Sequence, residues 1–304
     1  MPDVKNRNPA PKPPQRPREL QDPLNYYLYH PLAWRLARGL AHTPLTPNMV
    51  SVFGAMMVIA AAFAYLQPGY PWTVAAGLAL HMGWHVVDGA DGDLARLTGR
   101  ASPIGEMVDG LCDYLSHVVL YLALGWLLSH QSALLGGLFA GWKGWLLMVA
   151  AGVSHAFQAN HVEVQRRQYQ WWVYGTPWLR NSHKGAESKT AGSWGGKLVS
   201  LYLDTASGMT PYALQVDAAV EGARGDSPRL AQIATAVRAE SPPLLLLCKV
   251  LGPNPRAVIL GLSMFAGSPL WYFLYQTFVL NALLVVSVNR HNAAARRIAA
   301  AIAA

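Results

Sequence analysis

Charged residues are scarce in this chain of 304 residues. They make up 13% of it, whereas hydrophobic residues make up 52%, and about a quarter of the residues are charged in typical soluble domains. Cysteine is scarcer still, because Cys112 and Cys248 are the only two. The shortage of charge excludes an ordinary soluble domain and indicates a membrane protein with soluble extensions. Two cysteines are too few for a disulfide framework.

The first 19 residues lack a continuous apolar stretch. Proline, lysine and arginine dominate them, whereas a cleavable signal peptide needs an apolar core of about 7–15 residues. We therefore expect no signal peptide here. Such a composition buries too little apolar surface to fold, so we expect a disordered, basic, proline-rich tail in the cytoplasm.

Basic residues outnumber acidic ones, and the formal net charge is +8. Lysine and arginine flank the apolar runs and form no continuous patch, which favours a partner membrane surface and no nucleic acid. The turns at 67–71 and 266–269 contain neither residue. This positive-inside pattern predicts that both termini and the acidic site described below face the cytoplasm.

The apolar runs predict an all-α integral membrane protein of about six transmembrane helices, preceded by an amphipathic interfacial helix. Thr46 and Pro47 are typical of a helix start, so the first membrane helix is expected to begin there. The predicted segments are a tail (1–19), the interfacial helix (20–45), transmembrane helices 1–4 with the catalytic residues (46–170), a cytoplasmic insertion (171–255), transmembrane helices 5 and 6 (256–290) and a C-terminal tail (291–304).

Four aspartates lie in one of the most apolar regions of the sequence. Asp88 and Asp91 are three residues apart and Asp109 and Asp113 four apart, so each pair shares one face of a helix. Four like charges brought together need a counter-charge. Mg²⁺ or Mn²⁺ supplies it best, because both prefer oxygen ligands. The spacing therefore predicts a metal site shared by two neighbouring helices.

The same residues belong to a longer pattern, D-x2-D-G-x2-A-R-x8-G-x3-D-x3-D, which runs from Asp88 to Asp113. This pattern resembles the signature of the CDP-alcohol phosphotransferases, or CDP-alcohol phosphatidyltransferases, which are integral membrane enzymes of phospholipid synthesis. Thr46-Pro47-Asn48 is similar to the T-P-N often found before the first membrane helix of that family. The chain after about residue 170 adds nothing to the resemblance.

The resemblance implies a role for each aspartate. Asp88, Asp91 and Asp109 would bind the metal ion, while Asp113 would deprotonate the attacking hydroxyl and is also counted among the metal ligands. Small residues let a nucleotide approach the backbone, and an arginine holds phosphate oxygens. The resemblance implies a homodimer and CDP binding around Asp88, Gly92, Ala95, Arg96 and Gly105.

Three other interpretations of the aspartates remain open. In the first, Arg96 forms salt bridges with one or two of them, but that arrangement leaves at least two acids unpaired. A calcium-binding EF-hand loop needs Glu at its twelfth position, where this chain has Gly99. An aspartate-rich prenyl-diphosphate site would share the metal but not the glycine and arginine spacing. Asp93 and Glu106 lie outside the pattern and are expected to be solvated or salt-bridged.

A polar stripe marks the fourth predicted membrane helix. Its residues recur at i, i+4, i+7 and i+11, which places them on one face of a helix. We predict that this face lines the pocket for the acceptor alcohol, together with His117, which follows Asp113 by four residues. Hydrogen bonding between helices explains the stripe equally well. The residues of the stripe are Ser154, Gln158, His161 and Gln165.

These observations predict a transferase of phospholipid biosynthesis. It would move a substituted phosphate from a CDP-linked donor to an alcohol and release CMP. CDP-diacylglycerol is the favoured donor, and a CDP-linked headgroup of the choline or ethanolamine kind, transferred to a lipid alcohol, is the alternative. The compact chain and its basic tail favour a bacterial inner membrane. A non-catalytic cation-binding or transport protein is the competing class.

Overall fold

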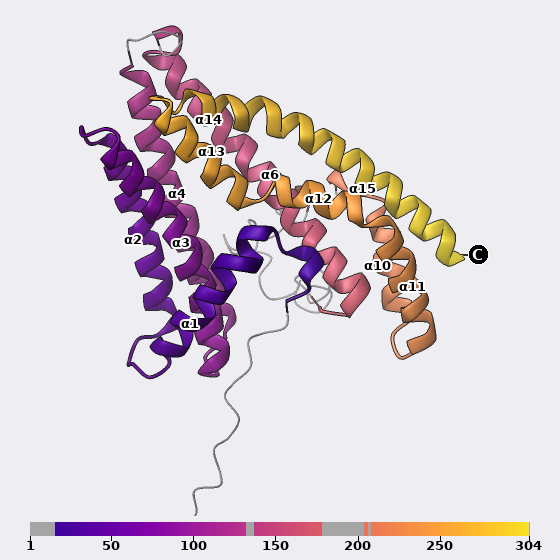
Figure 1. The fold of residues 1–304 in the computed structure, drawn as a ribbon. Helices are drawn as coiled ribbons and strands as arrows, with labels where there is room; N and C mark the ends of the chain where they lie inside the picture. The colour runs from indigo at the N-terminus through magenta and orange to yellow at the C-terminus, as the bar shows by residue number, and fades with distance from the viewer. Residues whose placement is uncertain (1–15, 132–136, 178–203, 206–207, 304) are drawn as a thin grey trace, which may run out of the picture. The chain divides into compact units, whose positions relative to one another are not determined.

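The computed structural model describes residues 16–131, 137–177, 204–205 and 208–303. Within these ranges the regular structure is helical and no β-strand occurs (Figure 1). In the described part of the chain, four helical stretches are long and apolar enough to cross a membrane: Pro47–Leu66, Ile104–Ser129, Pro242–Phe265 and Leu270–Ala303. The predicted class, an all-α integral membrane protein, is confirmed at this level.

The chain divides into two compact units, and the predicted catalytic aspartates all lie in the first. Unit 1 comprises Met1–Gly144 and Leu260–Pro269, and unit 2 comprises Trp145–Ile259 and Leu270–Ala304.

Unit 1 contains four principal helices: α1 (His30–Leu40), α2 (Pro47–Leu66), α3 (Trp72–Leu97) and α4 (Pro103–Ser129). A short 3₁₀ helix, η1 (Arg18–Leu20), and a π-helical turn, η2 (Asn25–Tyr29), precede α1. The Thr46 side chain caps α2 by accepting from the Met49 N–H, and Ser102 caps α4 by accepting from the Gly105 N–H. These caps satisfy N–H groups that the first helical turn leaves without partners. The predicted start of α2 is therefore confirmed.

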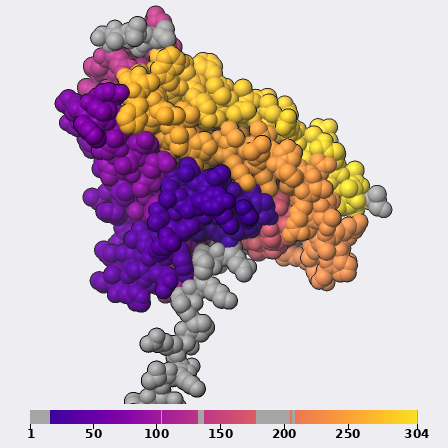
Figure 2. Space-filling view, in the orientation of Figure 1, coloured from indigo at the N-terminus to yellow at the C-terminus, as the bar shows by residue number. Residues whose placement is uncertain are grey.

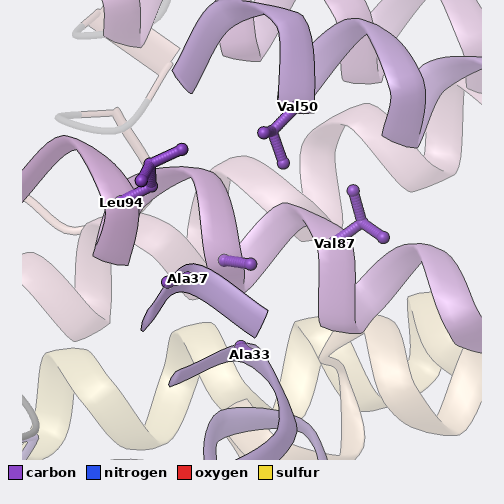
Figure 3. Close-up of a cluster of buried hydrophobic side chains, with 6 residues drawn as sticks. Ala33, Ala37, Val50, Val87 and Leu94 are labelled. Atoms are coloured by element: carbon purple, nitrogen blue, oxygen red, sulfur yellow. The ribbon is translucent and has the colours of Figure 1, made fainter. Parts of the chain in front are cut away.

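Small residues let α1 pack closely on α3. Ala33 and Ala37 of α1 are fully buried in a cluster with Val87, Ala90 and Leu94 of α3 (Figure 3). A Cβ atom added at Gly89 of α3 would lie only 3.1 Å from the Cβ of Ala33 in α1. Since neither side of this contact carries a large side chain, the N-terminal helix is held directly against the helix that bears Asp88 and Asp91.

The contact between α2 and α3 is equally close. α2 packs against both α3 and α4, which Figure 1 shows as neighbouring helices. A Cβ atom at Gly77 of α3 would lie 2.7 Å from the Tyr65 ring of α2. The ring therefore occupies the space that any other residue at position 77 would need.

Unit 2 contains most of α6 (Trp142–Tyr174) and most of the chain that follows it. Its other described elements include α10 (Ala213–Gly222), α11 (Ser227–Glu240), α12 (Pro242–Val250), the first part of α13 (Pro253–Phe265), α14 (Leu270–Leu274), a π-helical turn η4 (Tyr275–Val279) and α15 (Leu280–Ala303). The last helix packs against α10, α11 and α12.

Two segment boundaries differ from those expected. The apolar stretch Pro242–Phe265 starts within the predicted insertion 171–255, because α12 and α13 follow each other closely and are both apolar. Helix α15 continues through the predicted C-terminal tail to Ala303, since alanine has the highest helix propensity of all residues. Residues 178–203 of the predicted insertion lie outside the described part of the chain.

Candidate active site

The four predicted aspartates lie on two helices of unit 1 that follow each other in sequence. Asp88 and Asp91 belong to α3, and Asp109 and Asp113 belong to α4. The turn between the helices contains Gly99, whose φ of 65° is the left-handed conformation that favours glycine. Two helices joined by so short a turn present both carboxylate pairs to one region.

Three of the aspartates form a cluster able to hold a cation. One carboxylate oxygen each of Asp88, Asp109 and Asp113 lies within 4.8 Å of the others. Mg–O bonds are about 2.1 Å long and Mg²⁺ accepts oxygen ligands almost exclusively. These oxygens therefore fit a single hard divalent cation with little adjustment. The Trp84 Nε1–H donates to Asp113 Oδ1 at 3.1 Å, which orients this carboxylate.

Asp91, the fourth predicted ligand, lies outside that cluster of three. It is buried, and its Oδ2 accepts a hydrogen bond from the Ser51 hydroxyl of α2. Sequence reasoning missed Ser51. The available signal was a polar side chain one turn after the start of an otherwise apolar helix. This bond fixes the rotamer of Asp91 from a third helix.

A pocket of unit 1 opens beside the aspartates. It is lined by four residues predicted to bind the nucleotide, Gly92, Ala95, Arg96 and Gly105, and by Asp91 and Asp109. Asp88, the fifth predicted nucleotide residue, is not part of this lining. The lining also contains residues that sequence reasoning did not assign to the nucleotide: Pro47, Asn48, Ser51, Arg100, Ala101, Ser102 and Glu106.

Arg96 reaches the pocket by folding back along α3. Its guanidinium lies over Gly92, where an added Cβ would be 3.4 Å from Nη2. Nη2 also forms an ion pair with Asp93 Oδ1 at 2.6 Å. Arg96 thus pairs with an acid outside the motif, and Asp93 is salt-bridged, as expected for it.

The sequence of this region matches a known family. Residues 44–174 match the model of the CDP-alcohol phosphatidyltransferase family. These residues are a CDP-alcohol phosphatidyltransferase domain. The match covers the pocket, the three-aspartate cluster and all of α6.

The matches between this CDP-alcohol phosphatidyltransferase domain and individual relatives cover only part of each relative's length. An archaetidylinositol phosphate synthase from Pyrococcus horikoshii is 34% identical over 94 residues, 30% of this chain and 47% of that protein. A phosphatidylinositol phosphate synthase from Mycobacterium bovis is 29% identical over 96 residues, 32% of this chain and 43% of that protein. Ethanolaminephosphotransferase 1 from Pongo abelii is 28% identical over 110 residues, 32% of this chain and 28% of that protein.

The chain therefore spans less than half the length of each of these relatives. No solved structure matches the chain significantly.

His117, predicted for the acceptor pocket, lies close to Asp113 within the phosphatidyltransferase domain. Its Nδ1 is 2.8 Å from the Asp113 carbonyl oxygen, and its ring centroid is 4.6 Å from that of Trp84. Trp84 in turn donates to the Asp113 carboxylate. His117 is thus part of the surroundings of the predicted base, and its role toward an acceptor stays a prediction.

The other four predicted pocket residues are buried in unit 2, on α6. Gln158 Nε2 donates to the Gln276 carbonyl at 3.0 Å and to Asn281 Oδ1 at 2.7 Å. Asn281 Nδ2 donates to Ser154 Oγ at 2.9 Å. The stripe therefore makes the hydrogen bonds between helices that the alternative interpretation expected.

The C-terminal half of the stripe is bonded in the same way. His161 Nε2 lies 3.0 Å from Ser287 Oγ of α15. The Cys248 thiol of α12 donates to Gln165 Oε1 at 2.6 Å. Binding of an acceptor alcohol by this face stays a prediction.

Proposed function

We propose that this protein is a metal-dependent transferase that moves a substituted phosphate from a CDP-linked donor to an alcohol. The acceptor oxygen attacks the donor's phosphorus, the bond from that phosphorus to the bridging oxygen breaks, and CMP leaves. The observation that carries the proposal is the cluster of Asp88, Asp109 and Asp113 in one domain with the Arg96 pocket. Carboxylates can hold a divalent cation against a pyrophosphate, and an arginine can bind its phosphate oxygens directly.

Each aspartate has a distinct part in the proposed reaction. Asp88, Asp91 and Asp109 hold Mg²⁺ or Mn²⁺, with Asp113 within reach of the same ion. When bound, the cation would neutralise charge on the donor's pyrophosphate and on the CMP that leaves. Asp113 accepts the proton of the attacking hydroxyl and so serves as general base. Trp84 supports this role by orienting one Asp113 oxygen.

The nucleotide is proposed to occupy the pocket between α2, α3 and α4. Gly92, Ala95 and Gly105 leave space for it along the helix backbones. Arg96 supplies two guanidinium N–H groups to the phosphates, and Asp88 lies at the metal side of the nucleotide.

CDP-diacylglycerol is the proposed donor and a polar alcohol the proposed acceptor. The relative named phosphatidylinositol phosphate synthase supports this choice, since a phosphatidyl product requires a diacylglycerol donor. The match to an ethanolaminephosphotransferase supports the second candidate, in which a CDP-linked headgroup is transferred to a lipid alcohol.

The acceptor alcohol is proposed to contact His117 and the stripe of α6. His117 adjoins the base, and the buried hydroxyl, amide and imidazole groups of the stripe suit a polyol. If His161→Ala leaves turnover and acceptor affinity unchanged, this part of the proposal is wrong. The stripe would then serve helix packing alone.

The protein is proposed to cross the bacterial inner membrane six times, with α3 and α6 as the additional spans. Both are long enough, at 26 and 33 residues, and a membrane enzyme tolerates polar residues where they face its interior. Both termini and the aspartates would face the cytoplasm, and two copies would form a homodimer. Exposed Tyr27, Leu28 and Leu32 suit an interfacial position for the N-terminal helix.

The decisive experiment is a transfer assay with purified protein in lipid nanodiscs. CDP-diacylglycerol, CDP-choline and CDP-ethanolamine are each combined with polar and lipid alcohols, including inositol phosphate, and products are identified by mass. We expect CMP release that requires Mg²⁺ or Mn²⁺ and stops on addition of EDTA. Cation binding without CMP release from any donor would favour the competing class, a non-catalytic cation-binding or transport protein.

A further inference from the structure

Arg16, which precedes the first helix, forms an ion pair with the motif helix α3. Arg16 Nη2 lies 2.7 Å from Asp93 Oδ1, and Arg96 Nη2 lies 2.6 Å from the same oxygen. The Asp93 side chain is fully buried, while that of Arg16 is 25% exposed. Two arginines that are far apart in the sequence thus share one buried carboxylate.

Local contacts hold Arg16 in this position. Its carbonyl oxygen accepts from Gln21 Nε2 at 2.9 Å, and Gln21 Oε1 lies 2.7 Å from Nδ1 of His30. His30 is the first residue of α1, which packs on α3 through Ala33 and Ala37. Figure 2 shows this N-terminal region, in indigo, at the molecular surface. The ion pair therefore belongs to a docked segment.

The shared carboxylate also fixes the guanidinium of Arg96. That group lies over Gly92 and lines the pocket, although its side chain is 52% exposed. A half-exposed arginine is ordinarily mobile, because a long side chain loses rotamer entropy when it is held. The ion pair with Asp93 offsets this loss before any ligand binds, which preorganises the site.

The summed charge of the three groups explains why Arg16 matters in addition to Arg96. Asp93 carries one negative charge, and Arg16 and Arg96 carry one positive charge each, so the three groups together are positive by one. Without Arg16 the sum is zero, and the buried carboxylate retains Arg96 as its single arginine partner among these groups. Such a neutral pair attracts a phosphate less than a group with an excess positive charge does.

We propose that Arg16 and Asp93 are positioning residues that hold Arg96 ready for the phosphates of the nucleotide donor. The N-terminal segment thereby completes the nucleotide pocket, although it lies outside the matched domain. This inference rests on the proposed function, because it assigns the pocket to a CDP-linked donor.

The test compares Arg16→Ala, Arg16→Gln and Arg16→Lys with wild type in the full-length protein. We expect the KM for the CDP donor to rise about tenfold in Arg16→Ala and Arg16→Gln, with kcat within about twofold of wild type. Arg16→Lys keeps the charge and should recover most of the affinity. Arg18→Ala is the matched control, because Arg18 packs on the Tyr26 ring at 4.8 Å and does not contact Asp93 in any described ion pair.

The dissociation constant of CDP in the presence of Mg²⁺ is measured on the same variants. An unchanged KM and CDP affinity in Arg16→Ala overturns the inference, as does an equal loss in Arg18→Ala. A fall in kcat without a change in KM also overturns it. If wild type binds CDP but releases no CMP, the transferase proposal fails and the CDP affinities decide the role of Arg16. If wild type does not bind CDP, both proposals are wrong.

Discussion

Two of the motif aspartates, Asp113 and Asp91, have different hydrogen-bond partners. Asp113 accepts from Trp84, whereas Asp91 accepts from Ser51, so the two carboxylates are oriented by different helices. A carboxylate that an indole N–H orients is suited to accept a proton. One that is buried and held by a hydroxyl is suited to act as a fixed ligand.

Asp113→Asn should abolish transfer and leave nucleotide binding nearly intact. An amide retains the shape of the side chain but does not accept the proton, so we expect turnover to fall by about 10²–10⁴-fold. CMP release and CDP affinity are measured together. Asp88→Asn is the comparison, because a lost ligand should weaken both. Equal losses of CDP affinity in the two variants would mean that Asp113 is not the base.

Ser51→Ala should weaken metal binding although Ser51 belongs to no part of the motif. Removing the hydroxyl frees Asp91 Oδ2, and loss of such an orienting partner costs about 10–100-fold in metal affinity or activity. The Mg²⁺ concentration that gives half-maximal CMP release is the measurement. Ser51→Thr keeps a hydroxyl and is the control, and raised Mg²⁺ should restore activity to Ser51→Ala. A normal Mg²⁺ requirement would contradict the prediction.

At the scale of elements, contacts between small residues place the site helices. Gly77 accommodates the Tyr65 ring, and Gly89 lies against Ala33. α3 is therefore fixed against α2 along one side and against α1 near the aspartates. This packing sets the rotation of α3, and with it the direction of Asp88 and Asp91.

Gly77→Val should destabilise unit 1. Its Cβ would lie 2.7 Å from the Tyr65 ring, and overpacking of a core costs about 1–3 kcal/mol. The midpoint of thermal unfolding in detergent is the measurement, and we expect it to fall. Gly39→Ala is the matched control, because nothing lies within 4 Å of its added Cβ and alanine favours a helix. Equal midpoints for the two variants would argue against this packing.

At the scale of the whole molecule, the proposed topology places two loops on opposite sides of the membrane. His42 follows α1 on the proposed cytoplasmic side, and Gln67 follows α2 on the other side; both are exposed. The native thiols Cys112 and Cys248 are partly buried, so their background labelling should be low.

In intact cells an impermeant maleimide should label Gln67→Cys and leave His42→Cys unlabelled. Opening the cells should make His42→Cys reactive, since charge placement puts the N-terminal region inside. Labelling of both variants in intact cells, or of His42→Cys alone, would refute the proposed orientation.

The sequence alone determined the start of α2 and the grouping of the aspartates. Pro47 and its cap Thr46 act within one turn, and spacings of three and four residues fix which side chains share a face. The extent of α15 was not predictable in this way, because its Ala-rich end lacks a clear stop signal. The hydrogen-bond partners of the α6 stripe were not predictable either, because they lie in another helix, as Asn281 and Ser287 do.

Only the tertiary structure decided which distant residues complete the site. Ser51 and Asp91 are 40 positions apart, and Arg16 and Asp93 are 77 positions apart. Local periodicity specifies the face of one helix, whereas such pairs depend on how neighbouring helices are rotated and how closely they pack. The local sequence sets the spacing of the carboxylates. The distant partners of these carboxylates come into contact because small residues such as Ala33 and Gly89 let the helices pack closely.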